Sequence, residues 1–141
     1  MVSIITGVKG TSKTKKLVEL VNEAVERSLG NVICVEQKPT LTFHVSSRAR
    51  LIAANDYKIK GFAALYGFLS GICAGDHDIT DIFMDATLRI GSRDYEELAV
   101  FLQAISDLSI AADKHFVFTI SANPEDLPEH IFVICKEIEK S

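Results

Sequence analysis

The chain contains no tryptophan, few prolines and cysteines, and no apolar run long enough to cross a membrane. A membrane-spanning helix needs about 20 consecutive apolar residues, so no contact with a membrane is expected. The N-terminus lacks the basic segment and long apolar stretch of a secretory signal peptide. The cysteines lie far apart in apolar runs, which is typical of reduced, buried thiols: Cys34, Cys73 and Cys135. These features predict a cytoplasmic protein.

Neither positive nor negative charge is in large excess, because the 141 residues carry a formal net charge of −4. A weakly acidic balance is unfavourable for coating nucleic acid, so nucleic acid is not an expected partner. The histidines show no metal-ligand spacing. With 48% hydrophobic residues, the chain can bury about two-thirds of its unfolded surface, and residues 1–141 are expected to form one domain.

The strongest motif in the chain follows its first apolar run, which covers Val2 to Ile5. A phosphate-binding loop has the pattern G-x-x-x-x-G-K-[ST] between a strand and a helix. The corresponding residues here are Gly7, Val8, Lys9, Gly10, Thr11, Ser12, Lys13 and Thr14. Only Ser12 departs from the pattern, because a second glycine is expected there.

The chemistry of phosphate binding explains these residue types. Gly7 and Gly10 allow backbone conformations that a side chain would penalise, so that N–H groups can face phosphate oxygens. Lys13 would contact the β- and γ-phosphates, and the Thr14 hydroxyl would reach a Mg²⁺ ion. The alternative is a glycine-containing turn before a surface helix, with the nearby lysines as a solvated patch.

The rest of the chain alternates between strand and helix patterns. Strands are expected at 2–6, 32–36, 79–84, 116–120 and 131–135, and helices at 14–28, 62–73 and 94–112. Residues 41–53 alternate in polarity and are expected to form two short antiparallel strands joined near Ser46. Gly67 and Gly71 lie four residues apart and suggest close packing on their helix. The charged tail 136–141 is expected to be frayed.

This order predicts an α/β protein with three layers, in which helices cover both faces of a mainly parallel sheet of about five strands. Ligands bind beyond the carboxyl ends of such strands. Asp85 follows the apolar segment 82–84 and would hold Mg²⁺; the alternative is a turn or N-cap aspartate. Glu36 ends the second strand and could orient a water; the alternative is a polar strand end. Ser121 ends the strand at 116–120.

These residues carry a resemblance to P-loop NTPases of the RecA/KaiC-like branch. The loop, the strand ending in Glu36, the segment ending in Asp85 and the strand ending in Ser121 follow that branch's order. The resemblance implies that Glu36 is the catalytic base and that Ser121 is a polar sensor near the γ-phosphate. The chain also resembles a small bacterial family often labelled as similar to the twitching-motility ATPase PilT, a label that rests on the shared loop.

The expected function is therefore binding of a nucleotide, ATP rather than GTP, with Mg²⁺ and slow hydrolysis. Two departures favour an alternative, a non-catalytic module that senses nucleotide or binds a protein: Ser12 in the loop, and Ala86 where many ATPases carry a second acid. A small-molecule kinase with its acceptor pocket in residues 41–75 is a third possibility. Because the chain has little of its own to cover a γ-phosphate, self-association or an unidentified protein partner is expected.

Overall fold

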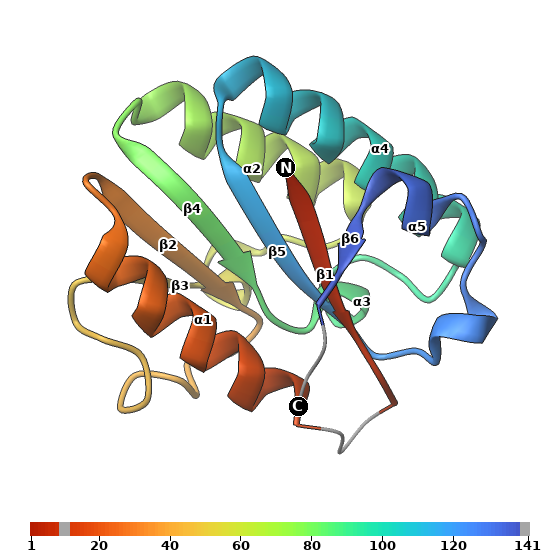
Figure 1. Ribbon diagram of the computed structural model, residues 1–141, viewed down its shortest axis with the longest axis horizontal. Helices are drawn as coiled ribbons and strands as arrows, with labels where there is room; N and C mark the ends of the chain where they lie inside the picture. The colour runs from red at the N-terminus through yellow and green to blue at the C-terminus, as the bar shows by residue number, and fades with distance from the viewer. Residues whose placement is uncertain (9–11, 139–141) are drawn as a thin grey trace.

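The computed structural model describes residues 1–8 and 12–138, and six parallel strands form its central sheet in the order β3-β2-β4-β5-β1-β6 (Figure 1). The strands are β1 (Val2–Thr6), β2 (Asn31–Glu36), β3 (Arg50–Ala53), β4 (Ile79–Met84), β5 (His115–Ile120) and β6 (Lys136–Glu137). The expected α/β class and parallel sheet are confirmed, and the sheet has six strands where about five were expected.

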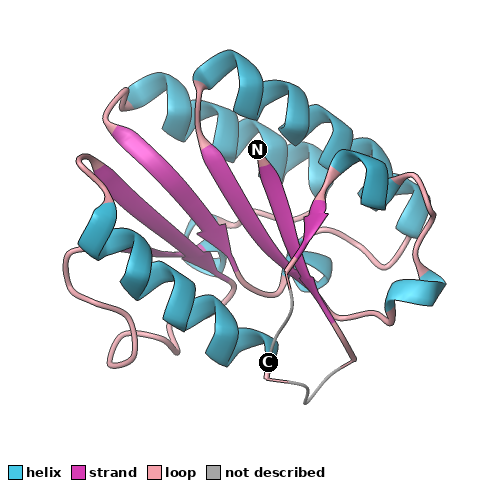
Figure 2. Ribbon diagram, viewed as in Figure 1, coloured by secondary structure: helices cyan, strands magenta, loops and turns pink. Residues whose placement is uncertain are grey.

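Helices cover both faces of this sheet (Figure 2). Helix α1 (Lys13–Arg27) lies on one face, and α2 (Phe62–Gly75) and α4 (Tyr95–Ala112) lie side by side on the other. Two short helices, α3 (Thr87–Ile90) and α5 (Ile131–Ile134), add buried residues to the core beneath α2 and α4. Turns of 3-10 helix occupy Ala54–Tyr57 and Pro124–Asp126.

Alternation along the strands divides the apolar residues between two cores. Ile5, Val32, Cys34 and Phe83 pack under α1, whereas their neighbours Ile4, Ile33, Val35, Ile82 and Met84 pack under α2 and α4. Because successive side chains of a strand point to opposite faces, a sheet covered on both faces needs continuous apolar runs. This requirement explains why the central strands could be located from the sequence.

The expected antiparallel pair within residues 41–53 is wrong. Only Arg50–Ala53 is a strand, and it pairs in parallel with β2. The N–H of Val45 donates to the carbonyl of Leu41 at 3.1 Å, so these two residues lie one helical turn apart and both pack against α1. Phe43, between them, is 97% exposed. Leu41 and Val45 therefore share a face through a spacing of four, not through strand alternation.

The expected strand at 131–135 is also wrong, because Ile131–Ile134 form helix α5. The strand comes directly afterwards: Lys136 and Glu137 pair with β1, and the N–H of Ile138 donates to the carbonyl of Ile4 at 2.8 Å. This part of the tail is therefore not frayed, and residues 139–141 lie outside the described residues. Four apolar residues in a row fit a buried helical turn as well as a strand, so the pattern alone does not distinguish them.

Gly67 and Gly71 do not provide the close packing that their spacing suggested. Both are exposed on α2, and a Cβ atom added at either position would meet nothing within 4 Å.

Candidate functional site

The carboxyl ends of β1, β2, β4 and β5 place the predicted site residues at one edge of the sheet. Glu36 lies two residues after Cys34, and Asp85 lies two residues after Phe83, so each carboxylate is on the same face of the sheet as the earlier residue. Cys34 and Phe83 both pack under α1. The two carboxylates therefore stand on the face where α1 begins with Lys13. Lys9, Gly10 and Thr11 belong to the predicted loop but lie outside the described residues.

The backbone at both ends of the loop adopts conformations that favour glycine. Gly7 has φ 144°, and its N–H donates to the carbonyl of Ala122 at 3.0 Å. Ser12 is the N-cap of α1 and adopts the left-handed conformation with φ 65° and ψ 22°. Serine thus takes a left-handed backbone where the motif expects glycine, at a steric cost that glycine would avoid.

Lys13 is not part of a solvated surface patch. Its side chain is buried, and Nζ donates to the carbonyl oxygen of Val8 at 2.9 Å. The neighbouring Lys15 is exposed. Lys13 therefore turns back toward the loop, which is the direction in which a phosphate would lie.

Thr14 and Asp85, 71 positions apart in the chain, meet through their side chains. The Thr14 hydroxyl donates to the Asp85 carboxylate, with distances of 3.1 Å to Oδ2 and 3.3 Å to Oδ1. The predicted pair of metal-binding residues therefore lies together. Hydroxyl and carboxylate oxygens are hard donors that suit Mg²⁺, which takes few protein ligands beside water and phosphate oxygens. The described residues contain no group of three or more His, Cys, Asp or Glu side chains that could hold a metal alone.

Asp85 has a second hydroxyl partner that the sequence analysis missed. The Thr119 hydroxyl donates to Asp85 Oδ1 at 2.7 Å and accepts the N–H of Ala86 at 3.0 Å. Thr119 lies near the carboxyl end of β5, two residues before Ser121, and this spacing was the only indication of its place in the sequence.

Glu36 is held differently. Thr40 donates twice to Glu36 Oε1, from its N–H at 2.8 Å and from its hydroxyl at 2.9 Å. Oε2 is buried and has no hydrogen-bond partner among residues 1–8 and 12–138. Burying a carboxylate oxygen without a hydrogen bond raises the free energy of the folded state. Oε2 of Glu36 can therefore accept a hydrogen bond from a ligand or a water. The sequence carries no signal that predicts Thr40 as its partner.

The Cys34 thiol lies beneath the site and is influenced by the carboxylates of Glu36 and Asp85. Burial raises the pKa of the Cys34 thiol to about 12, and the negative charges of Glu36 and Asp85 act in the same direction. The thiol is fully buried under the edge. Cys34 is therefore a neutral core residue, as its apolar surroundings in the sequence indicated.

Ser121 lies at the same edge but outside this network. Its hydroxyl makes no hydrogen bond with any described residue, and its carbonyl oxygen accepts Arg93 Nη1 at 3.4 Å. The structure therefore brings Ser121 to the expected strand end without joining it to Asp85 or Glu36.

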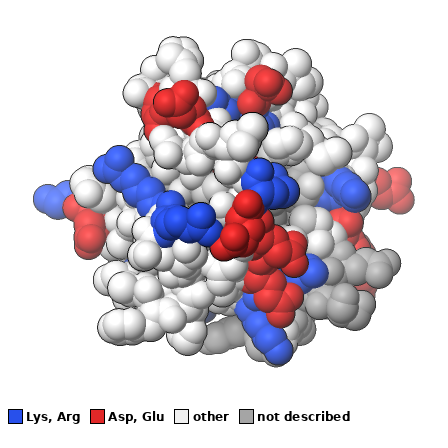
Figure 3. All heavy atoms as spheres, turned by 60° about the vertical axis from the view of Figure 1, so that its left-hand side comes forward, with Lys and Arg blue, Asp and Glu red and all other residues white. Residues whose placement is uncertain are grey.

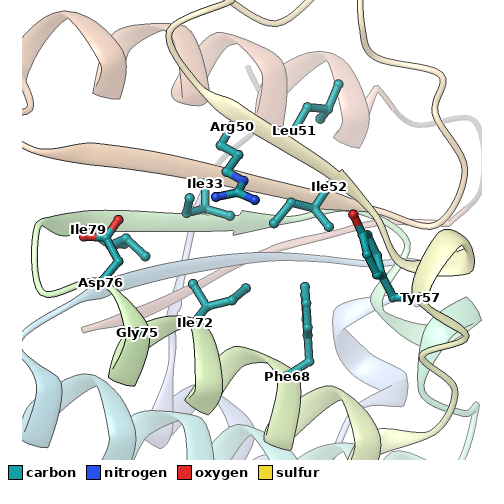
Figure 4. A pocket seen from close by; sticks show the side chains of 10 residues that line it. All are labelled: Ile33, Arg50, Leu51, Ile52, Tyr57, Phe68, Ile72, Gly75, Asp76 and Ile79. Atoms are coloured by element: carbon teal, nitrogen blue, oxygen red, sulfur yellow. The ribbon is translucent and has the colours of Figure 1, made fainter.

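A cavity of about 460 Å³ adjoins the network between α1 and the segment after β2. Thr14 and Thr40 belong to its lining, which also includes Lys15, Val18, Glu19, Leu41 and His44. A second cavity of about 430 Å³ lies between α2 and the edge strand β3, with Arg50 and Asp76 among its lining residues (Figure 4). No predicted site residue lines this second cavity.

The surface charges are mixed on the face toward the left of Figure 1. Lys and Arg side chains lie beside Asp and Glu side chains in a band across it (Figure 3). The residues drawn in colour form no continuous basic surface there.

Comparison with known proteins adds no family to this geometry: no protein-family model matches the chain, and no curated protein shows significant similarity to it. Within residues 1–8 and 12–138, no helix has the length and apolar character needed to span a membrane.

Proposed function

We propose that this chain binds ATP with Mg²⁺ at the carboxyl edge of its sheet, as a P-loop protein of the RecA/KaiC-like kind. The observation that carries the proposal is the contact between Thr14 and Asp85 at 3.1 Å. The sequence predicts the same role for both residues, that of holding Mg²⁺: Thr14 through the loop motif, and Asp85 as the strand-end acid that accompanies such a loop. Lys13 would contact the β- and γ-phosphates, and Ser121 would lie near the γ-phosphate.

The conformation of Ser12 supports a working loop. The residue has φ 65°, so the substitution of glycine by serine has not removed the left-handed turn at the start of α1. Serine, like every residue except proline, carries a backbone N–H group that can donate to a phosphate oxygen. The first N–H groups of a helix have no partner within the helix, and with its macrodipole they favour a phosphate.

Slow hydrolysis of ATP would depend on Glu36. In this proposal the carboxylate would accept a proton from the attacking water as the water oxygen bonds to the γ-phosphorus and the bond to the leaving ADP breaks. Mg²⁺ held by Thr14 and Asp85 would supply charge neutralisation at the phosphate oxygens.

A second candidate function, binding without turnover, is favoured by the surroundings of Glu36. Thr40 occupies Oε1 with two hydrogen bonds, and Oε2 is buried. A general base must lie within hydrogen-bond reach of its water, so a Glu36 held in this way would not activate water, and the protein would bind nucleotide as a sensor.

A cytoplasmic location and completion of the site by a second copy or another protein remain part of the proposal.

Calorimetric titration with Mg²⁺-ATP and Mg²⁺-GTP tests the binding. We expect ATP to bind with micromolar affinity and Lys13→Ala to abolish binding, because it removes the phosphate contact. Lys136→Ala, which removes an exposed lysine on β6 at a position paired with Ser3, is the control and should bind normally. Absence of binding by the wild type to either nucleotide would contradict the proposal.

Phosphate release then separates the two candidate functions. If the protein hydrolyses ATP, Glu36→Gln should retain binding and lower the turnover rate by about 100-fold or more, the typical contribution of a general base. Turnover that is unchanged in Glu36→Gln would exclude Glu36 as the base. Binding without any turnover by the wild type would favour the sensor.

A further inference from the structure

We propose that Thr119 is the positioning residue for Asp85, fixing its carboxylate so that Oδ2 faces Thr14 and the metal. This inference rests on the proposed function, because it concerns the same Mg²⁺ site. It assigns a role to a buried threonine in the middle of the sheet.

The directions of the hydrogen bonds carry the argument. The N–H of Ala86 can only donate, so the Thr119 oxygen accepts it at 3.0 Å. The single hydroxyl proton of Thr119 is then directed to Asp85 Oδ1 at 2.7 Å, a short distance that is typical of a hydroxyl bound to a charged carboxylate. The proton of Thr119 is thus committed, and it has none left to donate to a phosphate.

Burial makes this bond an effective constraint. Thr119 is 1% exposed and pairs in register with Ile5 on the neighbouring strand β1. A hydroxyl held in the sheet cannot follow a moving carboxylate, so Asp85 keeps the orientation that Thr119 imposes. With Oδ1 held in this way, Oδ2 is the nearer of the two carboxylate oxygens to the Thr14 hydroxyl, at 3.1 Å against 3.3 Å for Oδ1.

The Thr119 hydroxyl also holds a residue with a left-handed backbone, Ala86. Ala86 has φ 60°, a conformation that is uncommon for residues other than glycine. Because Thr119 accepts its N–H, a purely structural role of Thr119, in holding Ala86, is the competing explanation. The experiment must separate these two roles.

The test is calorimetric titration of ATP, first with EDTA and then at rising Mg²⁺, on Thr119→Val and Thr119→Ser. We expect Thr119→Val to bind ATP normally in EDTA and to need about 10-fold to 100-fold more Mg²⁺ for the same gain in affinity. Thr119→Ser, which keeps the hydroxyl, should restore the wild-type Mg²⁺ dependence. Thr80→Val is the matched control, because it removes a strand hydroxyl that is bonded to Ser28, away from Asp85.

A double-mutant cycle with Asp85→Asn completes the test. If Thr119 acts through Asp85, adding Thr119→Val to Asp85→Asn should change the Mg²⁺ dependence no further. A Thr119→Val protein that melts at a lower temperature but keeps the wild-type Mg²⁺ dependence would show the structural role alone and overturn the inference.

The titrations distinguish failure of the proposed function from failure of the role assigned to Thr119. A wild type that binds no ATP under any condition would overturn the function and the inference together. A wild type whose ATP affinity rises with Mg²⁺, beside an equal response in Thr119→Val, would overturn the inference only.

Discussion

At the scale of single residues, the site combines side chains whose types were predictable with partners whose positions were not. Lys13, Thr14, Asp85 and Glu36 could be named because a motif or a strand end placed each of them. Their hydrogen-bond partners depend on which strands are neighbours and on how a turn closes. Thr119 in particular looks like an ordinary strand residue until β5 is known to lie beside β4.

Ser12 provides the first prediction at this scale. A residue with a Cβ atom in the left-handed region is destabilised by about 1 kcal/mol or more in the folded state, whereas glycine is not. Part of this gain is offset because glycine is more flexible in the unfolded chain. We expect Ser12→Gly to raise the free energy of unfolding by up to about 1 kcal/mol in urea titrations and to retain nucleotide binding. A clear loss of stability would show that the serine side chain makes a compensating interaction.

At the scale of elements, polarity patterns located the elements that span the core and were ambiguous at its margins. β2 and β4 are apolar runs with both faces covered, and α4 has the length and periodicity of a surface helix. The segment at 41–49 and helix α5 are short, and a few apolar residues fit a turn, a helical turn or a strand. Tertiary contacts with α1 and α4 decide between these conformations.

The glycines of helix α2 test this account of the elements. Gly71 is exposed, and an added Cβ atom would meet nothing within 4 Å, so Gly71→Ala should stabilise the protein by about 0.5–1 kcal/mol through helix propensity. Gly30→Ala is the opposing control, because its Cβ atom would lie 1.9 Å from the backbone oxygen of Asp78. Thermal and urea unfolding should therefore change in opposite directions in the two variants. A destabilised Gly71→Ala would indicate a packing role for this position.

At the scale of the whole molecule, the stability of the fold should depend on alkaline pH through its buried thiols. Burial raises the pKa of Cys135 from its ordinary value of 9.0 to about 12. Between these values the folded protein keeps a proton that the unfolded chain has lost. The free energy of unfolding should therefore be intact below pH 9 and decrease above it, by at most about 1.4 kcal/mol per pH unit for each such thiol.

Urea unfolding between pH 8 and pH 10 measures this decrease. Cys135→Ala should have a smaller dependence of stability on pH than the wild type, whatever its stability at pH 8. Equal slopes in the two proteins would contradict the assigned cause.

The order of strands in the sheet is the property of the whole molecule that the sequence did not reveal. Parallel pairing followed from the alternation of strands and helices, but many orders satisfy that alternation. In the observed order, β5 separates β1, which leads into the loop, from β4, which ends at Asp85. Thr14 nevertheless reaches Asp85 because α1 starts on the face toward which Asp85 points.

This strand order has a consequence for how the protein assembles during synthesis. Among the described residues β1 pairs only with β5 and β6, so it has no strand partner from this sheet until residues 115–120 have left the ribosome. Contacts so distant in sequence form slowly because a long loop must close first. A nascent chain that already carries the loop, Glu36 and Asp85 would still lack the strand that joins them. The proposed binding of nucleotide should therefore become possible only late in translation, when β5 inserts between β1 and β4.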